Sequence, residues 1–319
     1  MRNTTRLLLW TDSPGPYIGA ITQAGLADRV NIDTLSRKTQ PSETQRAETT
    51  VLLAAGVPPG LLPTMPNLRW AQSLTAGVEG WMALPDLPPD LTLTSARGTH
   101  RESMPENILG ALFHIAKPYA AIAEDQRQSL WRNRVAEPLN GRTLGIIGLG
   151  AIGQEVARLA TALGMRVIGT KRRPEPMPGL AEVLPADRTN EVLAASDYIL
   201  LLLPATPATE NFIDAGRLAH MKPNAWLLNF GRGHLINDED LIAAVTAKTI
   251  AGAVLDVFRT EPLPKEHKFW TTPGILVLPH IGGPHPDRDS IVARLFVDNL
   301  GRFLDGQPLR EVVDRAAGY

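Results

Sequence analysis

Short runs of apolar residues alternate with helical patterns from about residue 144 onward. The runs are apolar at every position, which is typical of strands buried on both faces of a parallel sheet. The predicted strands are Leu144–Ile147, Arg166–Gly169, Tyr198–Leu203, Ala225–Asn229, Gly252–Val257 and Ile275–Leu278. Apolar residues at helical spacing from Ile152 to Leu163 separate the first two strands, and acidic residues at 238–240 open a second helix. This alternation predicts an open, doubly wound α/β sheet.

The first hundred residues follow the same pattern less regularly. Four further strands are predicted at Leu7–Trp10, Val51–Ala54, Leu68–Gln72 and Leu91–Thr94. A capping box of Ser103 and Glu106 begins a helix that leads into the second sheet. A break at residues 282–286 precedes a last helix, Ser290–Leu304, which we interpret as a return to the first domain. The predicted domains are residues 1–102 together with 285–319, and an inserted domain over residues 103–284.

The composition narrows the classes of function. The 319 residues have a formal net charge of −1, so the chain has no global positive field to attract nucleic acid or a membrane surface. The absence of cysteine excludes disulfides, thiolate catalysis and cysteine-ligated metals, and the histidines show no metal-ligand spacing. No apolar run has the length of a secretory signal or a spanning helix. We therefore expect a soluble cytoplasmic protein without a metal, nucleic-acid or membrane partner.

A glycine-rich sequence follows the predicted strand that ends at residue 147. The pattern G-x-G-x-x-G occupies Gly148, Gly150 and Gly153, and a helix begins within it. This is the context of a dinucleotide-binding fingerprint, in which the glycines allow a tight turn, close approach of the pyrophosphate and helix–strand contact. The N–H groups of Ala151 and Ile152 would then face the phosphates at the positive end of the helix. The alternative is an ordinary glycine turn.

The end of the next strand bears on the choice between NAD and NADP. An NAD site usually places an acidic residue there, where it binds the ribose 2′-hydroxyl and repels a 2′-phosphate. This chain has three cations in that place, Lys171, Arg172 and Arg173, and no acidic residue before Glu175. The cations favour a phosphate, and hence NADP, over NAD. The alternative is a solvated basic loop.

Three polar residues follow three successive strands of the predicted sheet. Arg232, Glu261 and His280 come after the strands that end near residues 229, 257 and 278. Parallel α/β sheets place their ligands at the carboxyl ends of the strands. An arginine can hold a substrate carboxylate with two hydrogen bonds, and a histidine beside a carboxylate can exchange a proton with an alcohol or carbonyl. Each residue taken alone could instead be structural.

The sequence resembles the D-isomer-specific 2-hydroxyacid dehydrogenases, and more narrowly their glyoxylate/hydroxypyruvate reductase branch. The matching stretches are Gln72–Val78, Leu144–Gly153, Leu203-Pro204 with Thr206 and Thr209, Asn229–Gly233, Leu255–Phe258 with Glu261–Pro264, and Pro279–Gly283. They extend over nearly the whole chain in the family's order. The chain departs from the family at Thr75, where glycine is commoner, and at His234–Asn237, which replaces a stretch ending in Val-Asp. These departures bear on substrate preference more than on chemistry.

The resemblance implies a Rossmann dinucleotide-binding domain inserted into a flavodoxin-like substrate domain. It implies that the catalytic set is Arg232, Glu261 and His280, the first and last of which also contact the substrate. Backbone contacts to the substrate carboxylate are expected from Thr75, Ala76, Gly77 and Val78. Cofactor contacts are expected from Pro204, Thr209, Phe230, Gly231 and Gly282, and from Asp256 near the nicotinamide amide. In related reductases the region of Trp131 packs across a dimer interface, so we expect a homodimer in which Trp131 lies near the partner's cleft.

These observations predict an NAD(P)H-dependent reductase of small 2-oxo acids such as glyoxylate or hydroxypyruvate, with NADP(H) preferred and NAD(H) possible. Protonated His280 would supply a proton to the carbonyl oxygen, Glu261 would keep the imidazole charged and oriented, and Arg232 would anchor the carboxylate. Two alternatives stay open. One is a dinucleotide-sensing binding protein like the corepressors that share this fold, and the other is an NAD-linked dehydrogenase acting on phosphoglycerate.

Overall fold

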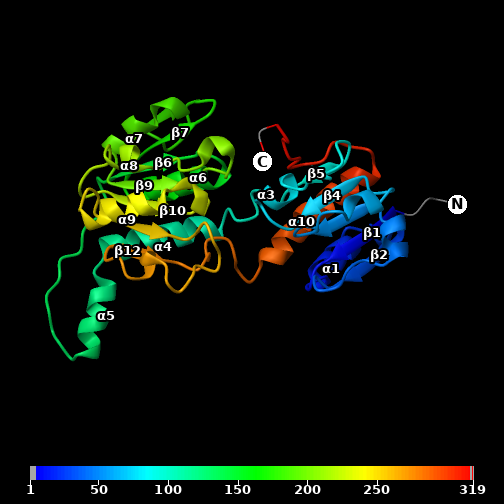
Figure 1. Ribbon diagram of the computed structural model, residues 1–319, viewed down its shortest axis with the longest axis horizontal. Helices are drawn as coiled ribbons and strands as arrows, with labels where there is room; N and C mark the ends of the chain where they lie inside the picture. The colour runs from blue at the N-terminus through cyan, green and yellow to red at the C-terminus, as the bar shows by residue number, and fades with distance from the viewer. Residues whose placement is uncertain (1–4, 317, 319) are drawn as a thin grey trace. The chain divides into compact units, whose positions relative to one another are not determined.

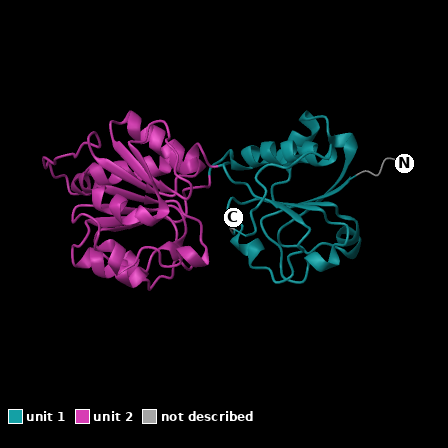
Figure 2. Ribbon diagram, turned by 90° about the horizontal axis from the view of Figure 1, so that it is seen from above, with its two compact units in different colours: residues 1–99, 285–319 teal, residues 100–284 magenta. Residues whose placement is uncertain are grey.

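The computed structural model describes residues 5–316 and 318. The chain forms two compact units (Figure 2). Unit 1 combines the residues up to Thr99 with those from His285 onward, and unit 2 is the continuous segment His100–Pro284. The chain therefore leaves unit 1 once, builds unit 2, and returns to complete unit 1.

Unit 1 contains a five-stranded sheet. Its strands are β1 (Thr5–Trp10), β2 (Val30–Leu35), β3 (Val51–Ala54), β4 (Trp70–Ser73) and β5 (Thr92–Thr94). They pair in the order β2-β1-β3-β4-β5, and every pair is parallel (Figure 1). This is the flavodoxin-like order of a doubly wound sheet, so the predicted fold class is confirmed for this unit.

Helices cover both faces of the unit 1 sheet, as the uniformly apolar strands predict. Helices α1 (Gly15–Gln23) and α10 (Arg288–Leu304) contribute to the core on one face and α3 (Glu79–Met82) to the core on the other, while α2 (Glu43–Glu48) contributes to neither. Successive residues of β1 enter different cores, with Leu9 in the cluster that contains Phe296 of α10 and Leu8 in the cluster on the other face. The Phe296 ring stacks on Trp70 of β4 at 5.3 Å between centroids. The last helix is thus part of the core of unit 1.

Unit 2 contains a seven-stranded sheet. Its strands are β6 (Thr143–Ile147), β7 (Arg166–Lys171), β8 (Glu182–Pro185), β9 (Tyr198–Leu201), β10 (Trp226–Asn229), β11 (Gly252–Leu255) and β12 (Ile275–Val277). The order is β12-β11-β10-β9-β6-β7-β8, with parallel pairing throughout (Figure 1). This is the Rossmann order with one added strand, and the strand order reverses between β6 and β9, where such sheets bind dinucleotides.

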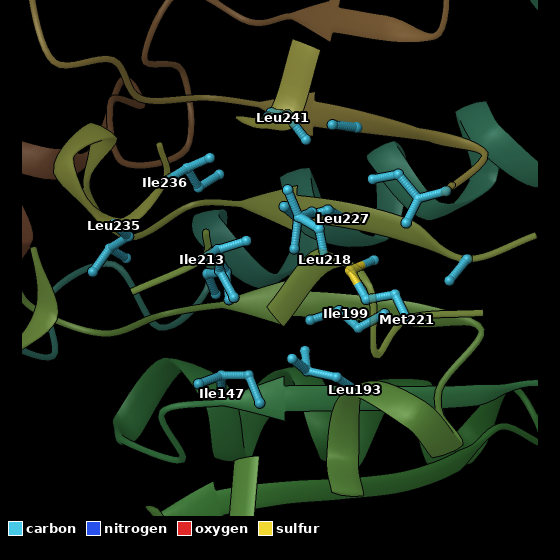
Figure 3. Packing of buried hydrophobic residues seen from close by; sticks show 14 of the residues in the cluster. Ile147, Leu193, Ile199, Ile213, Leu218, Met221, Leu227, Leu235, Ile236 and Leu241 are labelled. Carbon is cyan, nitrogen blue, oxygen red and sulfur yellow. The ribbon is translucent and has the colours of Figure 1, made fainter. Parts of the chain in front are cut away.

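Two hydrophobic clusters fill the faces of the unit 2 sheet. Ile146 and Ile147 of β6 enter different clusters, because neighbouring side chains of a strand point to opposite faces. Figure 3 shows the cluster that contains Ile147, which also includes Ile213, Leu235 and Ile236. The covering helices are α4 (Ser103–Ala116), α6 (Ala151–Ala162), α7 (Thr189–Ala195), α8 (Ala215–Leu218) and α9 (Asp238–Thr246). Over residues 5–316 and 318, none of the helices has both the length and the apolar character needed to cross a membrane.

Three details differ from the sequence-based expectation. The strands β2 and β8 were not predicted, because both are edge strands with polar residues at exposed positions. The predicted capping box at Ser103 is wrong, since Glu102 precedes the helix and no side chain caps it. The Ser103 hydroxyl instead lies 3.4 Å from the carbonyl oxygens of Gly282 and Gly283.

Candidate active site

The residues Arg232, Glu261 and His280 follow three adjacent strands of the unit 2 sheet. Arg232 comes after β10, Glu261 after β11 and His280 after β12, and these strands are neighbours in the sheet order. Because all three strands are parallel, their carboxyl ends meet at one edge of the sheet. The loops that carry the three predicted catalytic residues therefore lie next to one another.

The His280 imidazole and the Glu261 carboxylate form a direct pair. Nδ1 of His280 lies 2.6 Å from Oε2 of Glu261. The other carboxylate oxygen, Oε1, accepts a hydrogen bond of 2.8 Å from the backbone N–H of Phe258, which fixes the carboxylate plane. The side chains are 48% and 34% exposed, so the pair is accessible to a ligand. The remaining ring nitrogen, Nε2, is thus left for proton exchange with a substrate.

The backbone around His280 is held in an uncommon conformation. His280 has a φ of 54°, in the left-handed region that residues other than glycine rarely adopt. The buried carboxylate of Asp256 holds the next two residues, accepting hydrogen bonds from the N–H groups of Ile281 at 2.7 Å and Gly282 at 2.9 Å. Burial raises the pKa of Asp256, although both N–H groups favour the charged form. Asp256 therefore fixes the backbone that follows His280, and its contact with the nicotinamide amide stays a prediction.

Arg232 is positioned by the end of strand β10. The buried side chain of Asn229 accepts from the N–H of Gly231 at 3.1 Å and donates to the carbonyl of Arg232 at 2.9 Å. The guanidinium of half-buried Arg232 donates from Nη1 to the Gly231 carbonyl at 2.7 Å. Phe230 before it is buried. Asn229 thus fixes the turn that presents the arginine at the edge of the sheet.

The glycine-rich loop after β6 has the geometry that a dinucleotide pyrophosphate needs. Gly148 has a φ of +106°, as a tight turn there requires, and a Cβ at Gly153 would lie 2.8 Å from the Gly148 carbonyl oxygen. Nothing lies within 4 Å of a Cβ built on Gly150, so a ligand can approach its backbone. Helix α6 begins at Ala151 without a side-chain cap, which leaves the N–H groups of Ala151 and Ile152 facing the loop. These residues fit a bound dinucleotide.

The cationic triplet lies beside this loop. Lys171 ends β7, and the carbonyl of the preceding Thr170 accepts hydrogen bonds from the N–H groups of Gly148 and Leu149 at 3.3 and 3.0 Å. Arg172 and Arg173 are exposed in the loop that follows. The Lys171 ammonium forms an ion pair with Glu175, and hydrogen bonding to Lys171 lowers the pKa of that carboxyl. The acid that follows the triplet thus binds one of its three cations.

Two other segments carry predicted ligand contacts. In unit 2, Thr209 Oγ1 donates to the Pro204 carbonyl at 2.7 Å and accepts from the Thr206 N–H at 2.8 Å, which shapes the loop after β9. In unit 1, Thr75–Val78 follows β4 directly, and Thr75 Oγ1 donates to the Gly77 carbonyl at 2.7 Å. The threonine found where the family more often has glycine therefore stabilises the turn of its own segment.

Comparison with known proteins identifies the family. Residues 109–282 match the model of the D-isomer specific 2-hydroxyacid dehydrogenase NAD-binding domain. The chain belongs to this family. It is 30% identical over 305 residues, 93% of this chain and 95% of the relative, to glyoxylate/hydroxypyruvate reductase A of Serratia proteamaculans. As a family member, this dehydrogenase is an NAD(P)-dependent oxidoreductase that acts on CH–OH groups and the corresponding oxo groups.

Solved structures of the family superpose closely on this dehydrogenase. A family protein from Aeromonas salmonicida subsp. salmonicida has a TM-score of 0.87 and 34% identity, covering 98% of this chain and 100% of the other. The NADPH-dependent glyoxylate/hydroxypyruvate reductase of Sinorhizobium meliloti, solved with NADP and sulfate, has a TM-score of 0.85 and 28% identity. That match covers 99% of this chain and 100% of the reductase. The two-domain arrangement of parallel sheets is therefore the family's fold.

Sequence reasoning missed two groups at the site of the dehydrogenase. Asn229 had no assigned role, although a polar residue ending an otherwise apolar buried strand is a signal for one. The pairing of Glu175 with Lys171 was also missed, because a proline stands between them in the sequence. Their spacing of four residues is compatible with a contact in a turn as well as in a helix.

Proposed function

We propose that this dehydrogenase reduces small 2-oxo acids, of the glyoxylate or hydroxypyruvate type, to D-2-hydroxy acids. The observation that carries the proposal is the His280–Glu261 pair at 2.6 Å, whose residues follow β12 and β11, while Arg232 follows the adjacent strand β10. An acid–base pair beside a guanidinium suits a substrate with a carbonyl to be protonated and a carboxylate to be bound. Relatives named glyoxylate/hydroxypyruvate reductases support this substrate class.

In the proposed reaction, each residue of the catalytic set has one task. When bound, the reduced nicotinamide supplies the hydride that the carbonyl carbon receives. Nε2 of His280 donates the proton to the carbonyl oxygen, while Glu261 binds Nδ1 and stabilises the charged imidazole. Arg232 binds the substrate carboxylate and polarises the carbonyl.

NADP(H) is the preferred cofactor in this proposal, and NAD(H) is used less well. Lys171, Arg172 and Arg173 lie beside the glycine-rich loop, where the ribose 2′-phosphate of NADP would be bound. Glu175 is the first acidic residue after the three cations. Because its carboxylate pairs with Lys171, it is not available to bind the 2′-hydroxyl of NAD(H). The NADP found in the Sinorhizobium meliloti structure supports the same preference.

The partner we propose is a second copy of the chain. Helix α5 (Tyr119–Arg127) and the segment after it extend away from the sheet of unit 2 (Figure 1). This arm exposes large apolar side chains, with Trp131 95% exposed and Val135 85% exposed. The buried carboxylate of Asp125 binds Arg134 at 2.6 Å, so the arm has a fixed shape despite its exposure. Sedimentation equilibrium tests this, since a monomer at micromolar concentration would contradict it.

One substrate panel tests the proposed activity. We expect glyoxylate and hydroxypyruvate to be reduced with NADPH at a higher kcat/KM than with NADH, and the product to be the D isomer where it is chiral. Phosphohydroxypyruvate serves as the competing substrate, since a higher kcat/KM for it with NADH would favour the phosphoglycerate-type reaction. Tight NADPH binding without turnover of any 2-oxo acid would favour a sensing role.

A further inference from the structure

The side chain of Arg259 connects three loops at the carboxyl edge of the unit 2 sheet. Arg259 lies in the loop after β11, two residues before Glu261. Its guanidinium donates to Glu210 Oε1 at 2.6 Å and to Asn211 Oδ1, both in the loop after β9. It also donates to the carbonyl oxygens of His234, at 3.4 Å, and Ile236, in the loop after β10. The Arg259 side chain thus contacts both the loop after β9 and the loop after β10.

The two loops that receive Arg259 are already paired through their backbones. The N–H of Asn211 donates to the His234 carbonyl at 2.9 Å, and the N–H of Ile213 donates to the Leu235 carbonyl at 2.8 Å. Ile213, Leu235 and Ile236 are buried in the cluster shown in Figure 3, which anchors this pairing to the core. Arg259 therefore attaches the loop that carries Glu261 to a rigid pair of loops, one of which carries Arg232.

The backbones of the Arg232 and Arg259 loops are also in close contact. A Cβ placed on Gly233, the residue after Arg232, would lie 2.0 Å from the carbonyl carbon of Phe258 and 2.3 Å from the N atom of Arg259. The N–H of that same Phe258 donates to Glu261. Any shift of the Arg259 loop would consequently change the separation between Arg232 and Glu261.

Electrostatics keep the guanidinium in this position. The Arg259 side chain is 28% exposed, and besides Glu210 it faces the carboxylate of Asp238 with Nε at 3.5 Å from Oδ1. His267 approaches the other oxygen of Asp238 with Nε2 at 3.4 Å. The acceptors lie on different sides of a planar guanidinium, and a lysine ammonium is a point charge that cannot reach all of them.

We propose that Arg259 is a positioning residue of the reductase, which sets the spacing of Arg232 relative to the Glu261–His280 pair. In this proposal Arg259 acts through the loops it joins and not by contact with substrate or cofactor. This inference rests on the proposed function, because it assumes that Arg232, Glu261 and His280 form the catalytic set. A misplacement of about 1 Å in such a set can lower the rate about a hundredfold.

The test compares Arg259→Ala and Arg259→Lys with the parent enzyme in the reduction of a 2-oxo acid by NADPH. We expect Arg259→Ala to lower kcat by about 10- to 100-fold. Arg259→Lys should have a kcat only slightly above that of Arg259→Ala. The primary isotope effect on kcat, with NADPH deuterated at the transferred position, should rise, because a misaligned site slows the hydride step. Added guanidinium ion, too dilute to unfold the chain, should restore part of the kcat of Arg259→Ala, whereas ammonium should not.

Controls separate positioning from stability. Arg158→Ala removes a guanidinium that binds Glu155 on the same helix α6, at 3.1 Å from Nε, and should keep the parental kcat and isotope effect. If Arg259→Ala does not fold, Glu210→Gln removes the charged acceptor of an exposed loop and should lower kcat severalfold with a raised isotope effect. Parental kcat in Arg259→Lys and Glu210→Gln would overturn the inference. The inference would also be overturned if Arg259→Ala had a lower kcat with an unchanged isotope effect and no rescue by guanidinium ion.

The same assay distinguishes this inference from the proposed function. His280→Ala and Arg232→Ala are measured alongside. If either variant keeps parental activity, the proposed catalytic set is wrong. If both lose activity while the Arg259 variants do not, only the positioning role of Arg259 is wrong.

Discussion

Nδ1 of His280 and Oε2 of Glu261 lie 2.6 Å apart, and the second oxygen of Glu261 is held by the backbone N–H of Phe258. The carboxylate is therefore fixed before a substrate arrives, and it fixes the imidazole in turn. A glutamine could keep the hydrogen bond from Phe258 while losing the charge. This arrangement makes charge and geometry experimentally separable at one residue.

The first prediction concerns the proton donor. His280→Ala should lower kcat/KM by about 10²–10⁴-fold with NADPH binding retained, because the variant has no imidazole to protonate the carbonyl oxygen. Glu261→Gln should lower kcat/KM less, since the amide keeps the hydrogen bond from Phe258 but loses the charge beside the imidazole. The measurement is kcat/KM for parent and both variants, with NADPH binding by fluorescence. A His280→Ala variant with parental activity would show that the proton donor lies elsewhere.

The second prediction concerns the substrate anchor. Arg232→Lys keeps the positive charge but loses the planar pair of donors, so KM for the 2-oxo acid should rise and kcat should fall. The fold should survive, because Asn229 holds the backbone of residue 232 rather than its side chain. Steady-state kinetics and the melting temperature check both parts. Unchanged kinetics would mean that another group binds the carboxylate.

The third prediction concerns cofactor choice. Arg172→Ala should weaken NADPH binding by about 1.5–3 kcal/mol and leave NADH binding nearly unchanged, because only NADPH has the 2′-phosphate.

Glu175→Gln should have the opposite effect on cofactor binding. It frees Lys171 from its ion pair, so it should tighten NADPH binding about two- to fivefold. Glu191→Gln, which breaks a similar exposed pair with Arg188, is the matched control. Titration with both cofactors decides the matter, and equal effects on NADPH and NADH would contradict the assignment.

The fourth prediction concerns stability in acid. Burial alone would raise the pKa of Asp197, but hydrogen bonds from the Thr143 N–H and Lys222 outweigh it and leave the pKa below 3.8. The stability from this carboxylate is therefore present at neutral pH and lost as the pH falls through the lowered pKa. Asp197→Asn should destabilise unit 2 by roughly 1.5–3 kcal/mol at pH 7. Thermal unfolding of both proteins should show that difference shrinking below pH 3.8, whereas a constant difference would argue against it.

The sequence predicted the fold because the signals that define it are local. Uninterrupted apolar runs mark buried strands such as β6, and the glycine spacing marks the turn at Gly148. The edge strand β2 lacks such a run, because its Asn31 and Asp33 are not part of the core. A strand with one exposed edge needs no apolar residue at every position.

The site was predictable only where its residues follow strand ends. The pattern places Arg232, Glu261 and His280 at one edge of a sheet, and the family resemblance implies that Glu261 meets His280 there, as the structure shows. The contacts of Arg259 reach residues 210, 211, 234 and 236, which are far from it in the sequence and have no common spacing. Such contacts arise from the packing of loops, which local patterns do not encode.

The two-segment construction of unit 1 has a consequence for synthesis on the ribosome. Unit 2 is continuous, so its sheet can close as soon as residue 284 has emerged, whereas β1 still lacks the helix that contributes Val292, Phe296 and Leu300 to its core. Until α10 appears, Tyr17 and Ile21 of α1 cover Leu7 and Leu9 without the residues of α10, so the nascent first unit exposes apolar surface to chaperones and proteases. Chains that end at residue 284 and have left the ribosome should therefore yield a protease-resistant unit 2 and a digested unit 1. Helix α10, made after unit 2, thus completes the core around the first strand.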